Sequence, residues 1–311
     1  MKKLRIIITM KLRGGNQVAK NKIQVINGVY PVSVDEAIYI TSSNKKLSDE
    51  LRDIKNAQGN SANLDNYWKG KKVVIIGDSY SDPSNSHPKW YPYLESMLGI
   101  EIVRNYSVGG YRISKTRYTK DEVSGEITGS VDEYNHVQKV DSYDFTDVDI
   151  VIICTAINDF FSNVPFDKIV SAYQSVYTKD FDTTTFTGAY EYILRKVFTK
   201  TTTSTQKTPL VILCTPTNSK TLGAYKNDIG LTPSDYADEV RRIADAWGCA
   251  VCDWIRGSGW NADTVYSNTR SIKGVASDGC HPNEWGAERL GRMVVNTIKM
   301  YWIEDLFKDK G

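Results

Sequence analysis

Residues 73–82 read VVIIGDSYSD. Four consecutive β-branched residues predict a buried strand, and the Gly-Asp-Ser that follows predicts a sharp turn with Ser79 at its tip. In a parallel α/β sheet, ligands bind at the carboxyl ends of the strands. A serine there becomes a nucleophile only when a base and an oxyanion hole stand beside it, so the rest of the chain has to supply both.

Apolar runs alternate with helical patterns from residue 71 onward. The expected strands are 73–76, 100–104, 149–154, 210–214 and 250–253. Most are continuously apolar, which is typical of strands covered on both faces. The expected helices are 90–98, 233–247 and 282–307. The alternation predicts the α/β class, as a doubly wound three-layer α/β/α sandwich around a five-stranded parallel sheet.

The N-terminal part has a different pattern. Short strand-like runs precede a helical stretch in which Leu47, Leu51 and Ile54 share one face, and small polar residues typical of a linker follow. We therefore expect a small β-rich and helical module for attachment or oligomerisation, with its linker, at 1–66. The main domain is expected at 67–311. An irregular extension packed on the main domain is the alternative.

Two segments interrupt the α/β alternation. Residues 111–143 are polar and rich in tyrosine, with no clear period, and residues 177–207 are rich in threonine. Both are longer than ordinary connections in an α/β unit. They are expected to be loops that either shape a binding cleft or are surface insertions.

Composition and charge exclude several classes of function. The formal net charge of the 311 residues is only +2, without the basic stripe of a nucleic-acid-binding protein. The apolar run near the N-terminus, at 6–8, is too short for a signal peptide, and no stretch is long enough for a transmembrane helix. We expect a chain that is cytoplasmic as synthesised and binds neither nucleic acid nor membrane.

The five cysteines are expected to be reduced thiols, most of them buried. Cys249 and Cys252 form a CxxC within a strand-like run, where their side chains would point to opposite faces. No second pair completes a zinc site. Asp78, Asp82 and Asp159 show no recognised metal-binding spacing either, so neither a metal nor a cofactor is expected.

Three histidines are the candidates for a general base. His87 follows the serine in a polar loop and is expected to be a surface residue, and His136 lies in the irregular segment. His281 stands three residues after Asp278, so that one tight loop can present both groups. A base and the acid that orients it are what a serine nucleophile requires.

Four motifs in order resemble those of the SGNH hydrolases, also called GDSL esterases or lipases. They are GDSY at 77–80, NYSVGG at 105–110, TAIND at 155–159 and DGCHP at 278–282. One such tripeptide is a weak signal, but four in order across about 71–305, each at an expected strand end or helix start, are specific. The resemblance implies the flavodoxin-like SGNH fold.

The resemblance also implies a role for each matching residue. Ser79 would be the nucleophile, His281 the general base and then general acid, and Asp278 the residue that orients His281. The oxyanion hole would consist of the backbone N–H groups of Ser79 and Gly110 and the side-chain amide of Asn158. Donors placed in this way stabilise the tetrahedral oxyanion of acyl transfer.

The motifs depart from the family pattern at three places. Ala156 stands where the family usually has glycine, and Tyr80 stands where it usually has leucine. In the second motif either Gly109 or Gly110 could be the oxyanion donor, and alignment on Asn105 favours Gly110.

The implied activity is that of a serine esterase that removes a short acyl group, in particular acetyl, from a carbohydrate or another small ester. Polar, tyrosine-bearing insertions disfavour long acyl chains. Two alternatives stay open: a protein that binds glycan without turnover, and an acyltransferase with the same triad.

Residues 25–53, with AIYI at 37–40 and LSDEL at 47–51, resemble connector regions of bacteriophage tail and baseplate proteins. This resemblance implies a homo-oligomeric virion component that trims host-surface glycans. A free bacterial enzyme of polysaccharide metabolism is the competing context.

Overall fold

The computed structural model describes residues 68–170, 180–205, 208–218, 226–260 and 279–301. The module expected at 1–66 lies outside the described residues, and so do the phage-like stretch and Asp278. Within the described part, no helix is long and apolar enough to cross a membrane.

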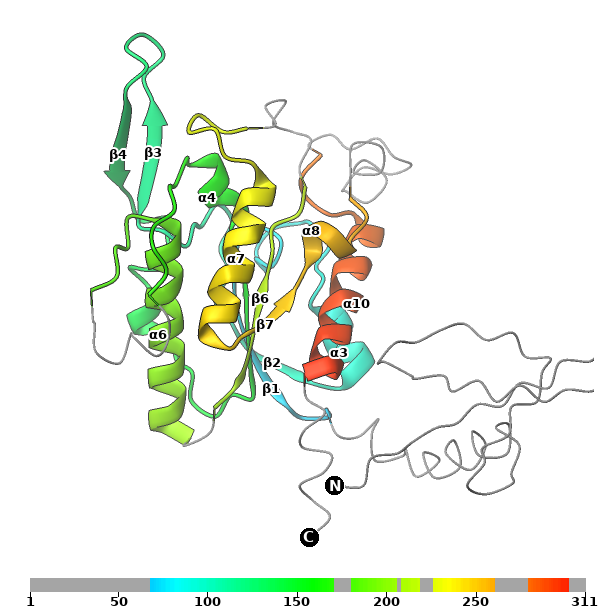
Figure 1. Ribbon diagram of the computed structural model, residues 1–311. Helices are drawn as coiled ribbons and strands as arrows, with labels where there is room; N and C mark the ends of the chain where they lie inside the picture. The colour runs from blue at the N-terminus through cyan, green and yellow to red at the C-terminus, as the bar shows by residue number, and fades with distance from the viewer. Residues whose placement is uncertain (1–67, 171–179, 206–207, 219–225, 261–278, 302–311) are drawn as a thin grey trace, which may run out of the picture. The chain divides into compact units, whose positions relative to one another are not determined.

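A five-stranded sheet forms the centre of the domain (Figure 1). Its strands, in spatial order, are β2 (Glu101–Asn105), β1 (Lys72–Gly77), β5 (Ile150–Cys154), β6 (Leu210–Cys214) and β7 (Ala250–Cys252). Every neighbouring pair is parallel. The parallel sheet expected from the apolar runs is therefore confirmed, and each strand end lies within two residues of its expected position.

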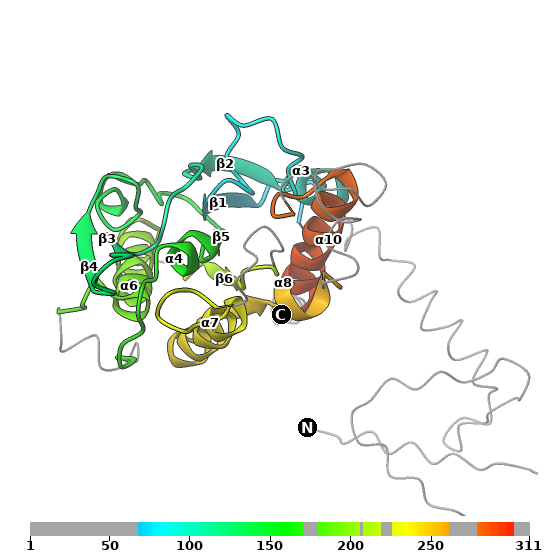
Figure 2. The ribbon, with the colours of Figure 1, turned by 90° about the horizontal axis from the view of Figure 1, so that it is seen from above.

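Helices cover both faces of this sheet, as Figure 2 shows from above. α3 (Pro92–Leu98), α8 (Trp254–Gly257) and α10 (Glu284–Tyr301) lie on one side and contact one another through α10. α6 (Phe186–Thr205) and α7 (Pro233–Trp247) pack together on the other side. The predicted three-layer sandwich is confirmed.

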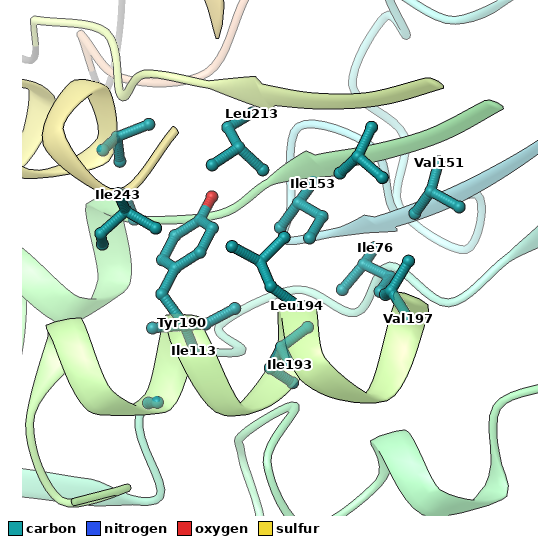
Figure 3. Close-up of a cluster of buried hydrophobic side chains, with 14 of the residues drawn as sticks. Ile76, Ile113, Val151, Ile153, Tyr190, Ile193, Leu194, Val197, Leu213 and Ile243 are labelled. Atoms are coloured by element: carbon teal, nitrogen blue, oxygen red, sulfur yellow. The ribbon is translucent and has the colours of Figure 1, made fainter. Parts of the chain in front are cut away.

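The core beneath α6 and α7 is continuous (Figure 3). Alternate strand residues meet helix residues spaced three or four apart, as the two periodicities require. The labelled side chains are Ile76, Ile113, Val151, Ile153, Tyr190, Ile193, Leu194, Val197, Leu213 and Ile243, and all ten are buried. Burying one such side chain stabilises the fold by roughly 1.5–3 kcal/mol, so this layer holds the strand ends firmly.

α7 shows how local sequence sets the ends of a helix. Thr232 caps its first turn by accepting from Asp235 N, and the Asp235 carboxylate accepts from Thr232 N at 2.7 Å in return. Pro233 occupies the first helical position, where no N–H is needed. Gly248 ends the helix in the left-handed conformation, at φ 65°.

The expectation of a loop at 177–207 is wrong, because α6 fills most of that segment. Threonine lowers helix propensity, which hides the helix in the composition. A helical spacing of large apolar residues is nevertheless present, at Phe186, Tyr190, Ile193 and Val197, and all four side chains are fully buried. Tertiary packing outweighs propensity here.

The segment 111–143 is also more regular than expected. It contains an antiparallel hairpin of β3 (Thr116–Lys120) and β4 (Ile127–Val131), which projects from the body in Figure 1. Asp121 closes its turn, since the Asp121 side chain accepts from Ser124 N at 2.6 Å and its N–H donates to Glu126 O at 2.8 Å. Every residue of β4 is exposed, so no apolar alternation marks this strand in the sequence.

The strand that follows β1 in the sequence of the sheet, β2, lies on one side of β1, and the next strand of this sheet, β5, lies on its other side. This is a topological switch point, where open α/β sheets bind ligands. Ser79 follows β1, and α4 (Ile157–Phe161), which carries Asn158, follows β5. The fold therefore brings two of the four motifs to one crevice.

Candidate active site

The turn that carries Ser79 is held from within. The carbonyl of Asp78 accepts from the N–H groups of Ser81 and Asp82, both at 3.0 Å, and the Asp78 carboxylate accepts from Tyr80 N at 3.1 Å. Gly77 is required just before the turn, because a Cβ there would lie 2.7 Å from Ser107 Oγ and 2.8 Å from Cys154 Sγ. The turn is thus a compact element on top of β1.

Ser79 and His281 meet although 202 residues separate them. His281 Nε2 lies 2.8 Å from Ser79 Oγ, which is hydrogen-bonding distance. The loop of His281 leads directly into α10, which packs against α3. The position of the imidazole therefore depends on how α10 packs against α3 and β7.

Tyr80 ties the loop of His281 to the sheet. Its hydroxyl donates to the carbonyl of Cys280 at 2.7 Å and lies 2.8 Å from Thr217 Oγ1. One hydroxyl has one hydrogen, so Thr217 donates and Tyr80 accepts in the second contact. The buried Tyr80 hydroxyl thus fixes the residue before His281, a contact that leucine at this position could not make.

His87 lies in a loop and is partly exposed, as expected of a surface loop residue, but it also contacts the candidate base, which the sequence did not predict. Its half-buried imidazole stacks on that of His281, with ring centroids 4.0 Å apart and an interplanar angle of 22°. The feature of the sequence that could have indicated a place in the active site is the position of His87, eight residues after Ser79 on the loop that follows the motif.

The glycine loop lies against Ser79. A Cβ built on Gly109 would be 3.8 Å from Ser79 Cβ, and Gly109 N donates to Asp82 Oδ2 at 2.7 Å. The N–H of Gly109 is therefore already engaged, which leaves Gly110 as the stronger of the two candidate donors. Gly110 has φ +81°, a left-handed conformation that glycine adopts without strain.

Asn158 is oriented by the same loop. Its side-chain amide donates to the carbonyl of Tyr111 at 3.0 Å, which uses one of the two amide hydrogens. The neighbouring Asp159 is buried and accepts from Ile113 N at 2.9 Å and Ser114 N at 3.0 Å. Ala156, which stands where the family usually has glycine, is buried and precedes the first residue of α4.

The three aspartates near the site are engaged with backbone N–H groups. Asp82 also accepts from Ser84 N at 2.8 Å, and these hydrogen bonds lower its pKa although partial burial opposes the shift. Burial raises the pKa of both Asp78 and Asp159 to about 7.

Among the described residues, no group of three or more histidine, cysteine or acidic side chains could hold a metal. All five cysteines are free thiols, and only Cys249 is not fully buried.

His136 supports the site from beneath. The ring is fully buried, and Nε2–H donates to the carbonyl of Gly77 at 3.0 Å. Nδ1 then accepts from the hydroxyl of Tyr143 at 2.8 Å, which identifies the neutral tautomer. Burial lowers the pKa of His136 to about 4.

A family model described as the GDSL-like lipase/acylhydrolase family matches residues 75–289. A solved structure from Lactobacillus plantarum is 16% identical over 76% of this chain and 99% of its own, with a TM-score of 0.53. A possible lipase from Chitinophaga pinensis is 15% identical over 74% of this chain and 98% of its own, with a TM-score of 0.52. Both likenesses concern the fold alone.

A search of curated proteins found no match. The family model supports the resemblance to SGNH hydrolases. Nothing in these comparisons supports the resemblance to phage tail proteins.

We expect Tyr80→Phe to lower kcat for ester hydrolysis by about 10-fold and the free energy of unfolding by about 2 kcal/mol. The change removes the buried hydrogen bonds that the Tyr80 hydroxyl makes with the Cys280 carbonyl and the Thr217 hydroxyl, and so loosens the loop of His281. Steady-state kinetics and urea unfolding measure both quantities. Tyr106→Phe is the matched control, because that hydroxyl accepts from Asp144 N at 2.8 Å instead; an equal loss of kcat in the control would contradict the role of Tyr80.

We expect the wild type to lose stability relative to His136→Gln as the pH falls from about 6.5 to about 4. In this window the unfolded chain protonates His136 and the folded chain does not, so unfolding is favoured, by at most about 3 kcal/mol. Glutamine retains an N–H donor for Gly77. Unfolding free energies of both proteins across this range test the prediction, because the difference removes the contributions of Asp78 and Asp159; parallel profiles would contradict it.

Proposed function

Because this chain belongs to the GDSL-like lipase/acylhydrolase (SGNH) family of carboxylic ester hydrolases, we propose that it is a serine esterase that removes short acyl groups, chiefly acetyl, from carbohydrates. One observation carries the proposal: Ser79 Oγ and His281 Nε2 lie 2.8 Å apart at the switch point of the sheet. This pairing is the nucleophile and base that acyl transfer needs.

In the proposed reaction, Ser79 Oγ attacks the ester carbonyl carbon while His281 Nε2 takes its proton. His281 then gives that proton to the departing alcohol, which leaves an acyl-enzyme. Water attacks the acyl-enzyme with the same proton transfers, and Ser79 is regenerated. We assign to Asp278, which lies outside the described residues, the role of accepting a hydrogen bond from His281 Nδ1–H and so orienting the imidazole.

The oxyanion is assigned three donors: the N–H groups of Ser79 and Gly110 and the second amide hydrogen of Asn158. Two features support this set. Gly109 N is engaged by Asp82, and Tyr111 already orients the Asn158 amide. Donors that are held in place before the reaction stabilise the tetrahedral oxyanion without reorganising, which makes them effective.

A pair of tyrosines beside the oxyanion loop supports a carbohydrate substrate. Tyr111 follows Gly110, and the ring of Tyr134 stands edge-on to it, with centroids 6.2 Å apart. Tyr134 is 52% exposed, yet its backbone is fixed, since its N–H donates to Asp132 Oδ1 at 3.0 Å and its carbonyl accepts from Arg112 N at 3.1 Å. A rigidly held, exposed tyrosine offers an apolar ring face and a hydroxyl, which suits a sugar.

We expect Ser79→Ala to lower the hydrolysis of p-nitrophenyl acetate by about 1,000-fold or more, because the change removes the hydroxyl that forms the acyl-enzyme in the proposed reaction. Ser86→Ala, an exposed serine of the same loop, is the matched control and should retain activity. The release of p-nitrophenol measures both. Undiminished hydrolysis by a folded Ser79→Ala would refute the serine mechanism.

We expect Tyr134→Ala to raise KM for acetylated oligosaccharides about 10-fold and to leave the hydrolysis of p-nitrophenyl acetate nearly unchanged, because only the glycan reaches the tyrosine pair. Tyr301→Ala is the matched control: Tyr301 is 50% exposed and ends α10, about 27 Å along the helix from the active-site end. An equal effect on both substrates, or in the control, would refute a sugar subsite at Tyr134.

A further inference from the structure

A second imidazole covers one face of the His281 ring. The ring of His87 is nearly parallel to it, with centroids 4.0 Å apart. In such a stack the ring nitrogens stay at the edges, so His281 Nε2 keeps its contact with Ser79 Oγ at 2.8 Å. His87 thus covers the face of the base without competing for the nitrogen that moves the proton.

The loop of His87 is built on the backbone of the nucleophile. The Asn85 side-chain amide donates to the carbonyl of Ser79 at 2.8 Å, and its oxygen accepts from His87 N at 3.2 Å. The ammonium of Lys89 donates to the carbonyl of Asn85 at 3.2 Å and also to that of His87. Asn85 therefore sets the position of the stacking ring relative to Ser79 itself.

The far end of this loop is anchored in the core. Trp90 is fully buried, and its indole N–H donates to Ser81 Oγ at 2.8 Å. Its ring also meets that of Trp254 edge-on, with centroids 5.6 Å apart. Because both ends of the loop are held, the stack is a built feature of the site and not a chance contact of a surface loop.

We propose that His87 is a positioning residue for His281: its ring face prevents the imidazole from rotating away from Ser79 and stabilises the imidazolium that forms during the reaction. This rests on the proposed esterase function. The proton passes from Ser79 Oγ to His281 Nε2 and on to the leaving alcohol oxygen, and His87 takes up none. An aromatic face attracts a cation stacked on it, most strongly when water is excluded.

The proposal has a kinetic signature. His281 becomes cationic both when the acyl-enzyme forms and when water cleaves it, so loss of the ring face slows both half-reactions by a similar factor. KM of a two-step acyl transfer depends on the ratio of these two rates, and the ratio is then unchanged. Loss of His87 should therefore lower kcat and leave KM nearly constant.

Three substitutions separate the ring face from side-chain bulk and from the ring nitrogens. His87→Ala removes all three, His87→Leu restores bulk alone, and His87→Phe restores the ring face without a titratable nitrogen. With p-nitrophenyl acetate, the alanine and leucine variants should lose about 10-fold in kcat with KM within about twofold of wild type, and the phenylalanine variant should stay within about twofold of wild type. Ser86→Ala is the loop control, and thermal unfolding shows that each variant is folded.

Wild type and Ser79→Ala are measured in the same assay, so the two proposals fail in different ways. An inactive wild type overturns the esterase function and the role of His87 with it. With an active wild type, full kcat in His87→Ala overturns the positioning role. A His87→Phe variant as slow as His87→Ala would show that the ring nitrogens matter and would overturn the stacking role. Wild-type kcat in His87→Leu would show that side-chain bulk is sufficient and would overturn it as well.

Discussion

The carbonyl oxygen of Gly77 accepts two hydrogen bonds, one from the buried imidazole of His136 at 3.0 Å and one from Val108 N at 3.1 Å. This single atom joins the end of β1, the glycine loop and the long segment between β2 and β5. A side chain at Gly77 would collide with Ser107 and Cys154, so the three parts meet at the closest distance that backbone permits. The turn of Ser79 starts one residue later, so the position of the nucleophile depends on this junction.

Above the junction, buried carboxylates arrange the backbone of the site. Asp82 holds Gly109, and Asp159 holds the stretch just beyond Tyr111, so the loop that carries Gly110 is fastened on both sides. An oxyanion hole is effective only if its donors are already in place when charge develops, since reorganising them would use up the stabilisation that they provide. Asp82 and Asp159 thus have an architectural role, because their carboxylates accept from backbone N–H groups on the two sides of this loop.

The side chains of Tyr80 and His87 hold the part of the site that carries His281. Tyr80 fixes the backbone of Cys280 from the first motif, and His87 covers the imidazole of the next residue. Both come from the twelve or so residues that begin with the serine turn, whereas His281 arrives from the far end of the chain. His281 is separated from Ser79 by 202 residues, so any shift of α10 would move the base relative to the nucleophile. The contacts of Tyr80 and His87, which follow Ser79 closely in the chain, oppose such a shift.

The amino-acid sequence by itself determined the fold class and which residues are candidates for the chemistry. Short continuous β-branched runs that end at turn residues favour buried strands, and the Gly-Asp-Ser, Asn-Asp and His-Pro motifs contain the residue types that acyl transfer needs. The helix α6 escaped prediction because the threonine-rich composition hid a helical spacing of apolar residues that the sequence does contain, and the exposed hairpin has no apolar alternation. Alignment on Asn105 favoured Gly110 over Gly109 as the proposed oxyanion donor, and only the tertiary structure shows that Asp82, 27 residues from Gly109, engages the Gly109 N–H. Tertiary structure alone placed His87 on His281, since a stack between residues far apart in the chain depends on where two loops meet in space, and no local pattern encodes that.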